Sequence, residues 1–264
     1  MDIPASLRRS EFPRSVGRPG FSLIETLVVI AIIAVLLGIL IPVLAGTRAS
    51  RLAAKRFSLL RQHGAIVLSY TTDFREQLPY FADKALERSI VRSKVADYQV
   101  DIPYFEAGGH WHIALNDGYY NGPLSPELFV SPDSHPAFLA EAVAYATSYK
   151  LTCTSFAVPE YWNPSTRLTD DSQLASVRTS LARQPSKKGL LRVTIIRDVP
   201  AAELGTLADL FLLDGSALSG AASSILYADP VGYSSGDGMP MRGHLDASPR
   251  IMHTIDGIAG RDLR

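Results

Sequence analysis

Residues 20–45 read GFSLIETLVVIAIIAVLLGILIPVLA, and this stretch decides the fold of the chain. From Leu27 to Ala45 no residue is charged, and as a helix this run would extend about 28 Å, close to the ~30 Å hydrocarbon core of a bilayer. One acidic residue, Glu25, lies near its start. A carboxylate costs about 2.5–3.5 kcal/mol at the centre of a membrane helix and less near its end, and such groups usually have a partner. The stretch therefore predicts a membrane segment whose carboxylate is paired.

The bulk composition limits the classes of function. The chain has 264 residues and a formal net charge of zero, which gives no global argument for a nucleic-acid partner. Its one cysteine, Cys153, cannot form an internal disulfide, so the globular part must be held by its core. We interpret Cys153 as a small core or surface residue and predict no nucleic-acid binding.

Three interpretations of the amino-terminal segment compete. A secretory signal peptide fits the arginine-rich residues 1–20 and the small residues near Ala45, but the apolar run exceeds the usual 7–15 residues. That interpretation, like a plain membrane anchor, leaves Glu25 without a partner. Cleavage between Gly20 and Phe21 would create an α-amino group that Glu25 of a neighbouring, axially displaced helix can reach. Such a buried pair would fix the stagger between helices, and removing one partner would cost several kcal/mol.

The residues Gly20-Phe21-Ser22-Leu23-Ile24-Glu25, followed by an apolar run, resemble the cleavage and methylation motif of type IV prepilins and type II secretion pseudopilins. Gly20 matches the position before the cut, Phe21 the residue that becomes N-methylated, and Glu25 the glutamate at mature position five. Ser22 replaces the commoner threonine. The resemblance implies a structural subunit rather than an enzyme. Its implied partners are a prepilin peptidase/N-methyltransferase, other pilin or pseudopilin subunits in a homo- or hetero-filament, and inner-membrane lipid.

The orientation of the segment follows from the resemblance and not from charge. Both flanks are basic, since five cations follow the apolar run: Arg48, Arg51, Lys55, Arg56 and Arg61. The positive-inside rule therefore does not choose an orientation. The resemblance implies a single-pass protein of the bacterial inner membrane with a cytoplasmic amino terminus, a periplasmic head, and a place in a filament after assembly. The basic stretch 48–61 could touch anionic lipid headgroups, and a solvated helix face explains it equally well.

The helix is expected to continue past the membrane segment, because no proline follows until residue 79. We predict about 50 helical residues, kinked or loosened near Gly38 and Pro42, the latter matching a helix-interrupting proline of many pilins. The second half is amphipathic, with apolar residues at helical spacing: Leu52, Phe57, Leu59, Leu60, Val67, Tyr70 and Phe74. The predicted fold class is α+β and pilin-like, a long amino-terminal helix packed on a carboxy-terminal antiparallel β-sheet head. The predicted domains are a leader (1–20), the membrane and assembly half of the helix (21–45), its amphipathic half (46–76) and the head (77–264).

The head is predicted from short patterns. Candidate strands are 156–158, 191–196, 210–213, 225–227 and 251–255, and candidate helices are 141–145 and 171–182. Asp214-Gly215 and Asp256-Gly257 are turn signals. Residues 164–189 are expected to form an exposed insertion.

Several head segments resemble the large pseudopilin-like proteins of planctomycete-type bacteria. They are 70–79 (YTTDFREQLP), 111–119, 128–133, Ser148-Tyr149 and 252–257. In residues 128–133 Ser131 stands where that family has a cysteine, so the resemblance does not carry a disulfide to this chain.

Three patterns suggest chemistry and are weighed against simpler interpretations. Ser234 lies in a G-x-S-x-G pattern with Asp246 and His253 downstream, but a poor helix start follows it, so a flexible loop is favoured over a serine hydrolase. His110 and His112 lack further ligands at metal-site spacing, so a partly exposed turn with Trp111 as a packing anchor is favoured. We predict no cofactor, with calcium held open at three aspartates of a Gly-rich region: Asp229, Asp237 and Asp246.

Overall fold

The computed structural model describes residues 22–81, 88–92, 99–122, 124–134, 147–168, 170–194, 209–220 and 254–263. The chain forms two compact units, Met1–Ala49 and Ser50–Arg264. The first unit contributes the apolar part of the long helix. The second contains the remainder of that helix together with the head, and each unit is treated by itself below.

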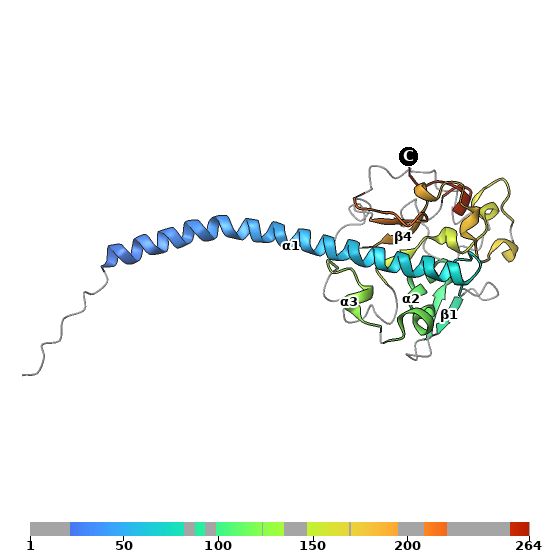
Figure 1. Ribbon diagram of the computed structural model, residues 1–264, viewed down its shortest axis with the longest axis horizontal. Helices are drawn as coiled ribbons and strands as arrows, with labels where there is room; N and C mark the ends of the chain where they lie inside the picture. Colours follow the sequence, from blue (N-terminus) through green and yellow to red (C-terminus); the bar gives the residue numbers. More distant parts are fainter. Residues whose placement is uncertain are drawn as a thin grey trace, which may run out of the picture. The chain divides into compact units, whose positions relative to one another are not determined.

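Helix α1 (Leu23–Asp73) has 51 residues, which confirms the predicted helix of about 50 residues (Figure 1). Pro42 lies inside it, and the chain remains α-helical on both sides of this residue. A proline has no N–H to donate, and its ring crowds the carbonyl four residues earlier, which here belongs to Gly38. The helix therefore does not break at Pro42, although this residue donates no backbone hydrogen bond.

The carboxyl end of α1 is closed by two residues in left-handed backbone conformation, Arg75 and Glu76, with φ angles of 54° and 66°. The Glu76 N–H bonds back to the carbonyl of Thr71 at 2.7 Å, which satisfies one of the carbonyls left open at a helix end. The chain then pairs with a distant segment, because the Leu78 N–H donates to the Val177 carbonyl at 2.8 Å. This backbone hydrogen bond fixes the position at which the chain leaves α1 and enters the head.

The second half of α1 buries one face in the head, between β4 on one side and α2 and α3 on the other (Figure 1). The predicted amphipathic pattern is largely confirmed. Leu59, Leu60 and Val67 are buried, while Leu52, Phe57 and Tyr70 are half-buried. The prediction is wrong for Phe74, which is 47% exposed and stacks on Tyr70 instead of entering the core.

A four-stranded antiparallel sheet with the order β3-β4-β5-β6 forms the centre of the head. Its strands are β3 (Tyr149–Leu151), β4 (Gly189–Val193), β5 (Leu210–Leu212) and β6 (Ala217–Leu218). A separate antiparallel hairpin pairs β1 (Arg88–Arg92) with β2 (Gln99–Pro103). The architecture is therefore α+β and pilin-like, as predicted.

Short helical turns fill the space between these elements. They are η1 (Tyr104–Gly109), α2 (Trp111–Ala114), η2 (Asn116–Tyr120), α3 (Pro126–Phe129), η4 (Cys153–Ser155), η5 (Pro159–Trp162), η6 (Asp171–Gln173), η7 (Thr179–Leu181), η8 (Pro185–Lys187) and η11 (Gly257–Ala259). They present large aromatic side chains to the core. Trp111 is fully buried and donates its indole N–H to the Tyr149 carbonyl at 2.6 Å, which confirms its role as a packing anchor.

The predicted strands of the head agree with the structure in part. The ranges 191–196 and 210–213 overlap β4 and β5. The predicted strand 156–158 is wrong, because within it only Ala157 makes an isolated bridge, to Leu174. Thr254 and Ile255 are also not in a strand, and the ranges 141–145, 225–227 and 251–253 lie outside the described residues.

The predicted helix 171–182 is wrong, whereas the predicted exposed insertion 164–189 is confirmed in part, because more than half of its described residues are exposed. The Asp170 carboxylate accepts the Ser172 N–H at 2.9 Å and so caps the start of η6. The helix does not continue to η7 because the backbone there pairs with a distant segment: the Gln173 carbonyl accepts the Val158 N–H at 3.0 Å, and the Ala175 N–H donates to the Phe156 carbonyl at 3.2 Å. Between the two turns, Leu174 and Val177 enter the core, with exposed fractions of 2% and 1%. The segment is therefore a structural part of the head.

Both predicted turns are confirmed. Gly215, with φ of 86°, closes the hairpin between β5 and β6, and the Asp214 carboxylate accepts the Ser216 N–H at 2.9 Å. Asp256 and Gly257 both adopt positive φ angles, of 60° and 54°. A Cβ at Gly257 would lie 2.3 Å from the Trp162 ring, so this turn needs glycine for packing as well as for conformation.

The carboxy-terminal segment is bound to β4 through a buried ion pair. Lys188 and Asp262 are almost completely buried, with 3.1 Å between Nζ and Oδ1. The second Asp262 oxygen accepts the Gly189 N–H at 2.8 Å, and Thr254 donates to the same carboxylate. Burial lowers the pKa of Lys188, while Asp262 acts in the opposite direction. This pair fastens the end of the chain to the middle of the sheet.

Candidate assembly surface

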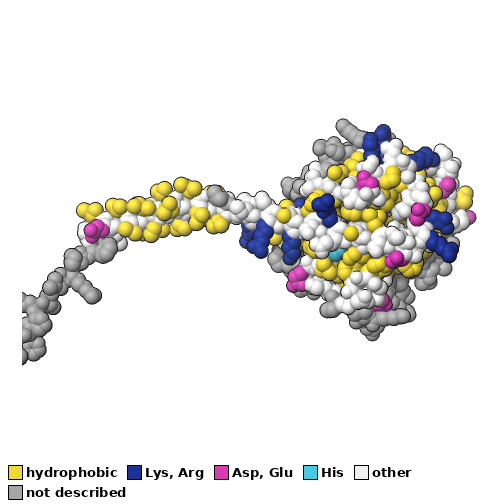
Figure 2. Space-filling model, in the orientation of Figure 1, with side chains coloured by type: hydrophobic (Ala, Val, Ile, Leu, Met, Phe, Trp, Pro, Cys, Tyr) yellow, Lys and Arg dark blue, Asp and Glu magenta, His cyan; other side chains and the backbone are white. Residues whose placement is uncertain are grey.

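The first half of α1 has exposed apolar side chains at positions all round the helix, and those on one face form the yellow segment of Figure 2. From Leu23 to Leu44 these side chains are 47–81% exposed: Leu23, Ile24, Leu27, Val28, Val29, Ile30, Ile32, Ile33, Val35, Leu36, Leu37, Ile39, Leu40, Ile41 and Leu44. Within the described part of the chain, α1 is the helix long and apolar enough to cross a membrane. A helix that is apolar all round needs lipid or other helices as its surroundings. Pro42 lies in this segment.

Glu25 lies in the first turn of α1 and closes a capping box with Ser22. One Glu25 carboxylate oxygen accepts the Ser22 N–H at 2.9 Å, and the Ser22 hydroxyl accepts the Ile24 N–H at 3.3 Å. Two N–H groups at the start of the helix are thereby satisfied. Analysis of the membrane segment missed this local role, although the spacing Ser-x-x-Glu before an apolar run is its usual sequence signal.

The two residues of the predicted cleavage site, Gly20 and Phe21, lie outside the described residues. Ser22 is the first described residue and precedes the helix, which begins at Leu23. The predicted pairing of Glu25 with an amine at Phe21 stays a prediction.

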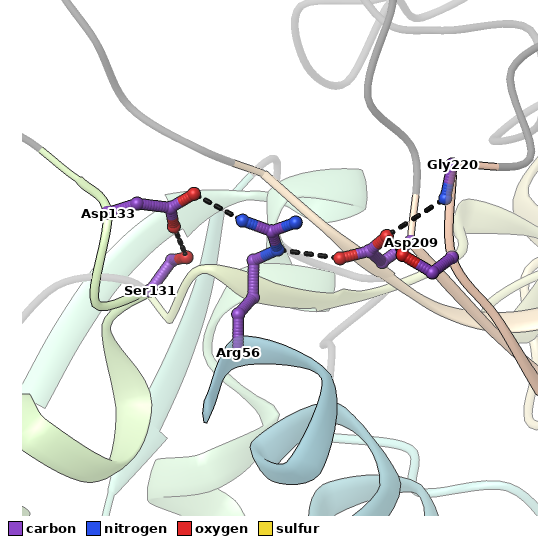
Figure 3. Close-up of polar contacts among 6 residues, drawn as sticks. Arg56, Ser131, Asp133, Asp209 and Gly220 are labelled. Atoms are coloured by element: carbon purple, nitrogen blue, oxygen red, sulfur yellow. Dashed lines mark hydrogen bonds and ion pairs between the residues drawn. The ribbon is translucent and has the colours of Figure 1, made fainter. Parts of the chain in front are cut away.

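A buried ionic clamp, formed by Arg56, Asp133 and Asp209, holds the helix to the head (Figure 3). The Arg56 Nε donates to Asp209 at 2.6 Å, and its Nη1 donates to Asp133. Asp133 lies after α3, and Asp209 immediately precedes β5. Burial acts to lower the Arg56 pKa, but the bonds and charges of the two aspartates outweigh it and raise the pKa. One helix residue thus joins two separate parts of the head.

The carboxylates of the clamp have further donors. Asp133 accepts the Ser131 hydroxyl, while Asp209 accepts the Ser219 hydroxyl at 2.8 Å and the Gly220 N–H at 3.1 Å. These bonds satisfy oxygens that a single guanidinium cannot reach, which is what a buried carboxylate requires. Sequence analysis placed Arg56 with the other cations of the basic stretch and missed the clamp.

His63 lies about two turns further along α1 than Arg56, among several aromatic rings. Its ring stacks on Phe129 with a centroid distance of 5.3 Å and meets the Trp111 ring edge-on at 5.5 Å. Nε2 lies 2.9 Å from the Leu128 carbonyl, which can only accept, so Nε2 carries the proton and Nδ1 accepts the Tyr120 hydroxyl. Burial lowers the His63 pKa to about 4, against the opposing effect of the Leu128 bond. His63 is a neutral packing residue.

The residues considered for other chemistry are placed as follows. His110 and His112 are both buried around α2, so the expected partly exposed turn is wrong, and His112 packs 4.8 Å from the Phe129 ring centre. Cys153 is buried as a small core residue, and its thiol donates to the Phe105 carbonyl at 3.8 Å. Among the described residues no group of three His, Cys, Asp or Glu side chains could hold a metal ion. Five residues lie outside this part of the chain: Asp229, Ser234, Asp237, Asp246 and His253.

Comparison with known proteins identifies the amino-terminal segment. Residues 17–41 match the family described as the prokaryotic N-terminal methylation motif. No curated protein and no solved structure matches the chain. Because the match ends within the apolar segment, the resemblance of the head to large planctomycete-type pseudopilins stays a prediction. The chain thus carries the prepilin-type cleavage and methylation motif at its amino-terminal end, and an exposed apolar helix continues this motif.

Proposed function

We propose that the protein is a structural subunit of a type II secretion pseudopilus or a type IV pilus-like filament. In this proposal a prepilin peptidase cuts between Gly20 and Phe21, the new amine is methylated, and the mature chain assembles through residues 21–44. The observation that carries the proposal is the methylation motif at residues 17–41, continued by a helix whose apolar side chains are exposed all round. An exposed apolar surface of this size is covered by lipid before assembly and by neighbouring helices after it.

Glu25 is proposed to direct the axial register of that assembly. In the single chain its carboxylate is held by the Ser22 N–H, a partner that carries no full charge. In a helix bundle without water, a charged amine stabilises the carboxylate far more than a neutral N–H group does. The Phe21 amine of a neighbouring subunit is such a partner, and the capping box keeps the Glu25 side chain at the start of the helix, where that amine would arrive.

The proposed location is the inner membrane, with the leader in the cytoplasm and the head in the periplasm. A helix of 51 residues is about 77 Å long, well over twice the ~30 Å apolar thickness of a bilayer. Only residues 21–45 are assigned to the membrane, and the later part of α1 is already committed to packing in the head.

Intact mass and amino-terminal sequencing of the membrane-extracted protein test the processing step. The expected product begins with N-methyl-phenylalanine at Phe21, and Gly20→Ala should leave the chain uncut. A start at Gly46 would refute the proposal in favour of an ordinary export signal, and an uncut Met1 in the native protein would support a plain anchor. In either case a secreted or anchored binding protein, or a hydrolase using Ser234, would become the account to test.

Filament formation is tested separately, in cells that express a pilus or type II secretion assembly apparatus. Glu25→Gln keeps the size of the side chain and removes its charge, so we expect at least a tenfold loss of subunits in sheared fibres. Glu160→Gln removes an exposed carboxylate of the head and is the matched control. Equal fibre yields from both variants would show that Glu25 does not direct assembly.

A further inference from the structure

The cations that follow the apolar segment of α1 differ in their surroundings. Arg56 is held in its clamp, and the Arg61 guanidinium lies 5.8 Å from the ring centre of Phe57. Arg48 and Arg51 are exposed, and within the described residues neither takes part in an ion pair. Figure 2 shows Lys and Arg side chains gathered on the helix directly after the apolar segment. These two arginines are therefore charges for which the described part of the chain provides no counter-charge.

Lys55 continues the same helix face, because residues 48, 51 and 55 are separated by three and four positions. We call these three side chains the basic face. Lys55 is exposed but also acts on Glu127, whose pKa is lowered mainly by its bond from Ser125 and to a lesser extent by Lys55. Arg48 and Arg51 are therefore the main charges of the basic face.

The position of the basic face along α1 matches a lipid headgroup layer. This layer is about 5–8 Å thick on each side of the hydrocarbon core. With a rise of 1.5 Å per residue, Arg48 follows Leu44 by about 6 Å and Arg51 by about 10 Å. The Cα–Cβ bonds of a helix point back towards its amino terminus, so both side chains lean towards the apolar segment. Their guanidinium groups thus come within reach of lipid phosphates.

Lipid accounts for these charges better than a second copy of the chain does. Between Thr26 and Thr72 the helix contains no acidic residue, so parallel helices side by side would bring cations against cations. These cations lie on the side of the membrane segment that is translocated with the head. Under the positive-inside rule they therefore do not help to orient the protein. A guanidinium group matches phosphate in shape and charge, and such side chains near an anionic surface each strengthen binding about fivefold.

We propose that Arg48 and Arg51, with Lys55 beside them, form a phosphate-binding face that concentrates anionic phospholipid around the unassembled subunit. The inference rests on the proposed membrane insertion of residues 21–45, and it is independent of cleavage and of filament formation. Subunits that gather the same lipid would share the negative charge between their basic faces, which reduces the repulsion between neighbouring helices before they assemble.

The test uses the full chain in phosphatidylcholine vesicles that contain spin-labelled lipid, either phosphatidylglycerol or phosphatidylcholine. The motionally restricted fraction of each label measures its association with the protein. We expect a clear preference for phosphatidylglycerol, a fall of at least about fivefold in Arg48→Gln/Arg51→Gln, and a similar fall in 0.5 M salt because salt screens exposed charge. Arg178→Gln/Arg183→Gln removes two exposed arginines of the head and should leave the preference unchanged.

Each other outcome is informative. An unchanged preference in Arg48→Gln/Arg51→Gln, or an equal fall in the control variant, overturns the proposal. If Arg48→Gln/Arg51→Gln reduces crosslinking between copies of the chain but leaves the lipid preference unchanged, the proposal is overturned in favour of a protein contact. Extraction of the chain by alkaline carbonate would refute membrane insertion itself, whereas correct lipid preference in a chain that is never cut would refute only the filament proposal. Thermal unfolding should be equal in both double variants, since all four side chains are exposed.

Discussion

Gly64 of α1 packs directly against the ring of Phe211, which is the central residue of β5. A Cβ added at Gly64 would lie 2.4 Å from three carbon atoms of that ring. The helix can approach the sheet this closely only because residue 64 has no side chain. Glycine inside a helix normally costs about 1 kcal/mol relative to alanine, so this residue is retained against helix propensity.

Gly64→Ala should lower the free energy of unfolding of the head by about 1–3 kcal/mol, because overpacking outweighs the gain in helix propensity. Gly46→Ala is the control, since a Cβ there meets nothing within 4 Å and should leave stability equal or higher. Thermal unfolding in detergent, followed by circular dichroism, measures both. A Gly64→Ala protein as stable as its parent would show that Phe211 moves away without cost.

Arg56→Met should be the most damaging single change in the clamp. It leaves Asp133 and Asp209 facing each other in a buried site without a cation, and removing one partner of a buried pair costs about 3–5 kcal/mol. Asp133→Asn should cost less, because Asp209 still holds the guanidinium at 2.6 Å. Denaturant unfolding of the two variants gives the comparison. A ranking in the opposite order would mean that Asp133, and not Arg56, is the essential member.

The lowered pKa of His63 should make the stability of the head depend on pH. Its pKa is about 4 in the folded chain and about 6.5 when unfolded, so between these values only the unfolded chain binds the proton. The free energy of unfolding should therefore fall as the pH drops from 6.5 to 4, by about 3 kcal/mol in all, and this contribution should not change further below pH 4. His63→Gln should be less stable at pH 7 and should lack this part of the pH dependence. An unchanged slope in His63→Gln would assign the effect to other groups.

Because Lys188 and Asp262 form a buried ion pair, substitutions at the two positions should have coupled effects on the free energy of unfolding. Lys188→Met or Asp262→Asn alone should destabilise the head by about 3–5 kcal/mol, since each leaves a buried partner unmatched. The double variant should be milder than the sum of the two singles, because no uncompensated charge remains. Lys187→Gln, at the neighbouring and more exposed lysine, should change stability by less than 0.5 kcal/mol. Additive losses in the double variant would argue against direct pairing.

The parts of the structure that could be predicted are those encoded by neighbouring residues. The apolar run fixes the helix through local spacing, Glu25 lies within four residues of its capping partner, and Asp214-Gly215 carries its turn in two residues. The Arg56 clamp could not be found this way, because its partners are 77 and 153 residues distant in the chain. An arginine in a basic stretch has the same local pattern whether it is exposed or buried.

The errors in the head have a similar origin. Residues 171–182 contain Leu174 and Val177 at a spacing of three, which suits a helix as well as it suits two separate core contacts. The backbone bond from the Ala175 N–H to the Phe156 carbonyl decides against the helix, because a continuing helix would need that N–H. Phe156 was expected in a strand because of its neighbours, yet its backbone follows the turn η4 and its ring packs edge-on against Phe81.

The Arg56 clamp has a mechanical consequence. In the proposed fibre, tension along the axis of α1 would pull the head against the helix it is packed on. Hydrophobic packing resists sliding weakly, since apolar contacts can be exchanged one turn at a time. Asp133 and Asp209 come from different segments of the head and both pair with the Arg56 guanidinium. They cannot move to another cation of α1 in this way, because the nearest ones are exposed and lie on a different face. In such a fibre, Arg56 would therefore set the load at which the head begins to slide along the helix.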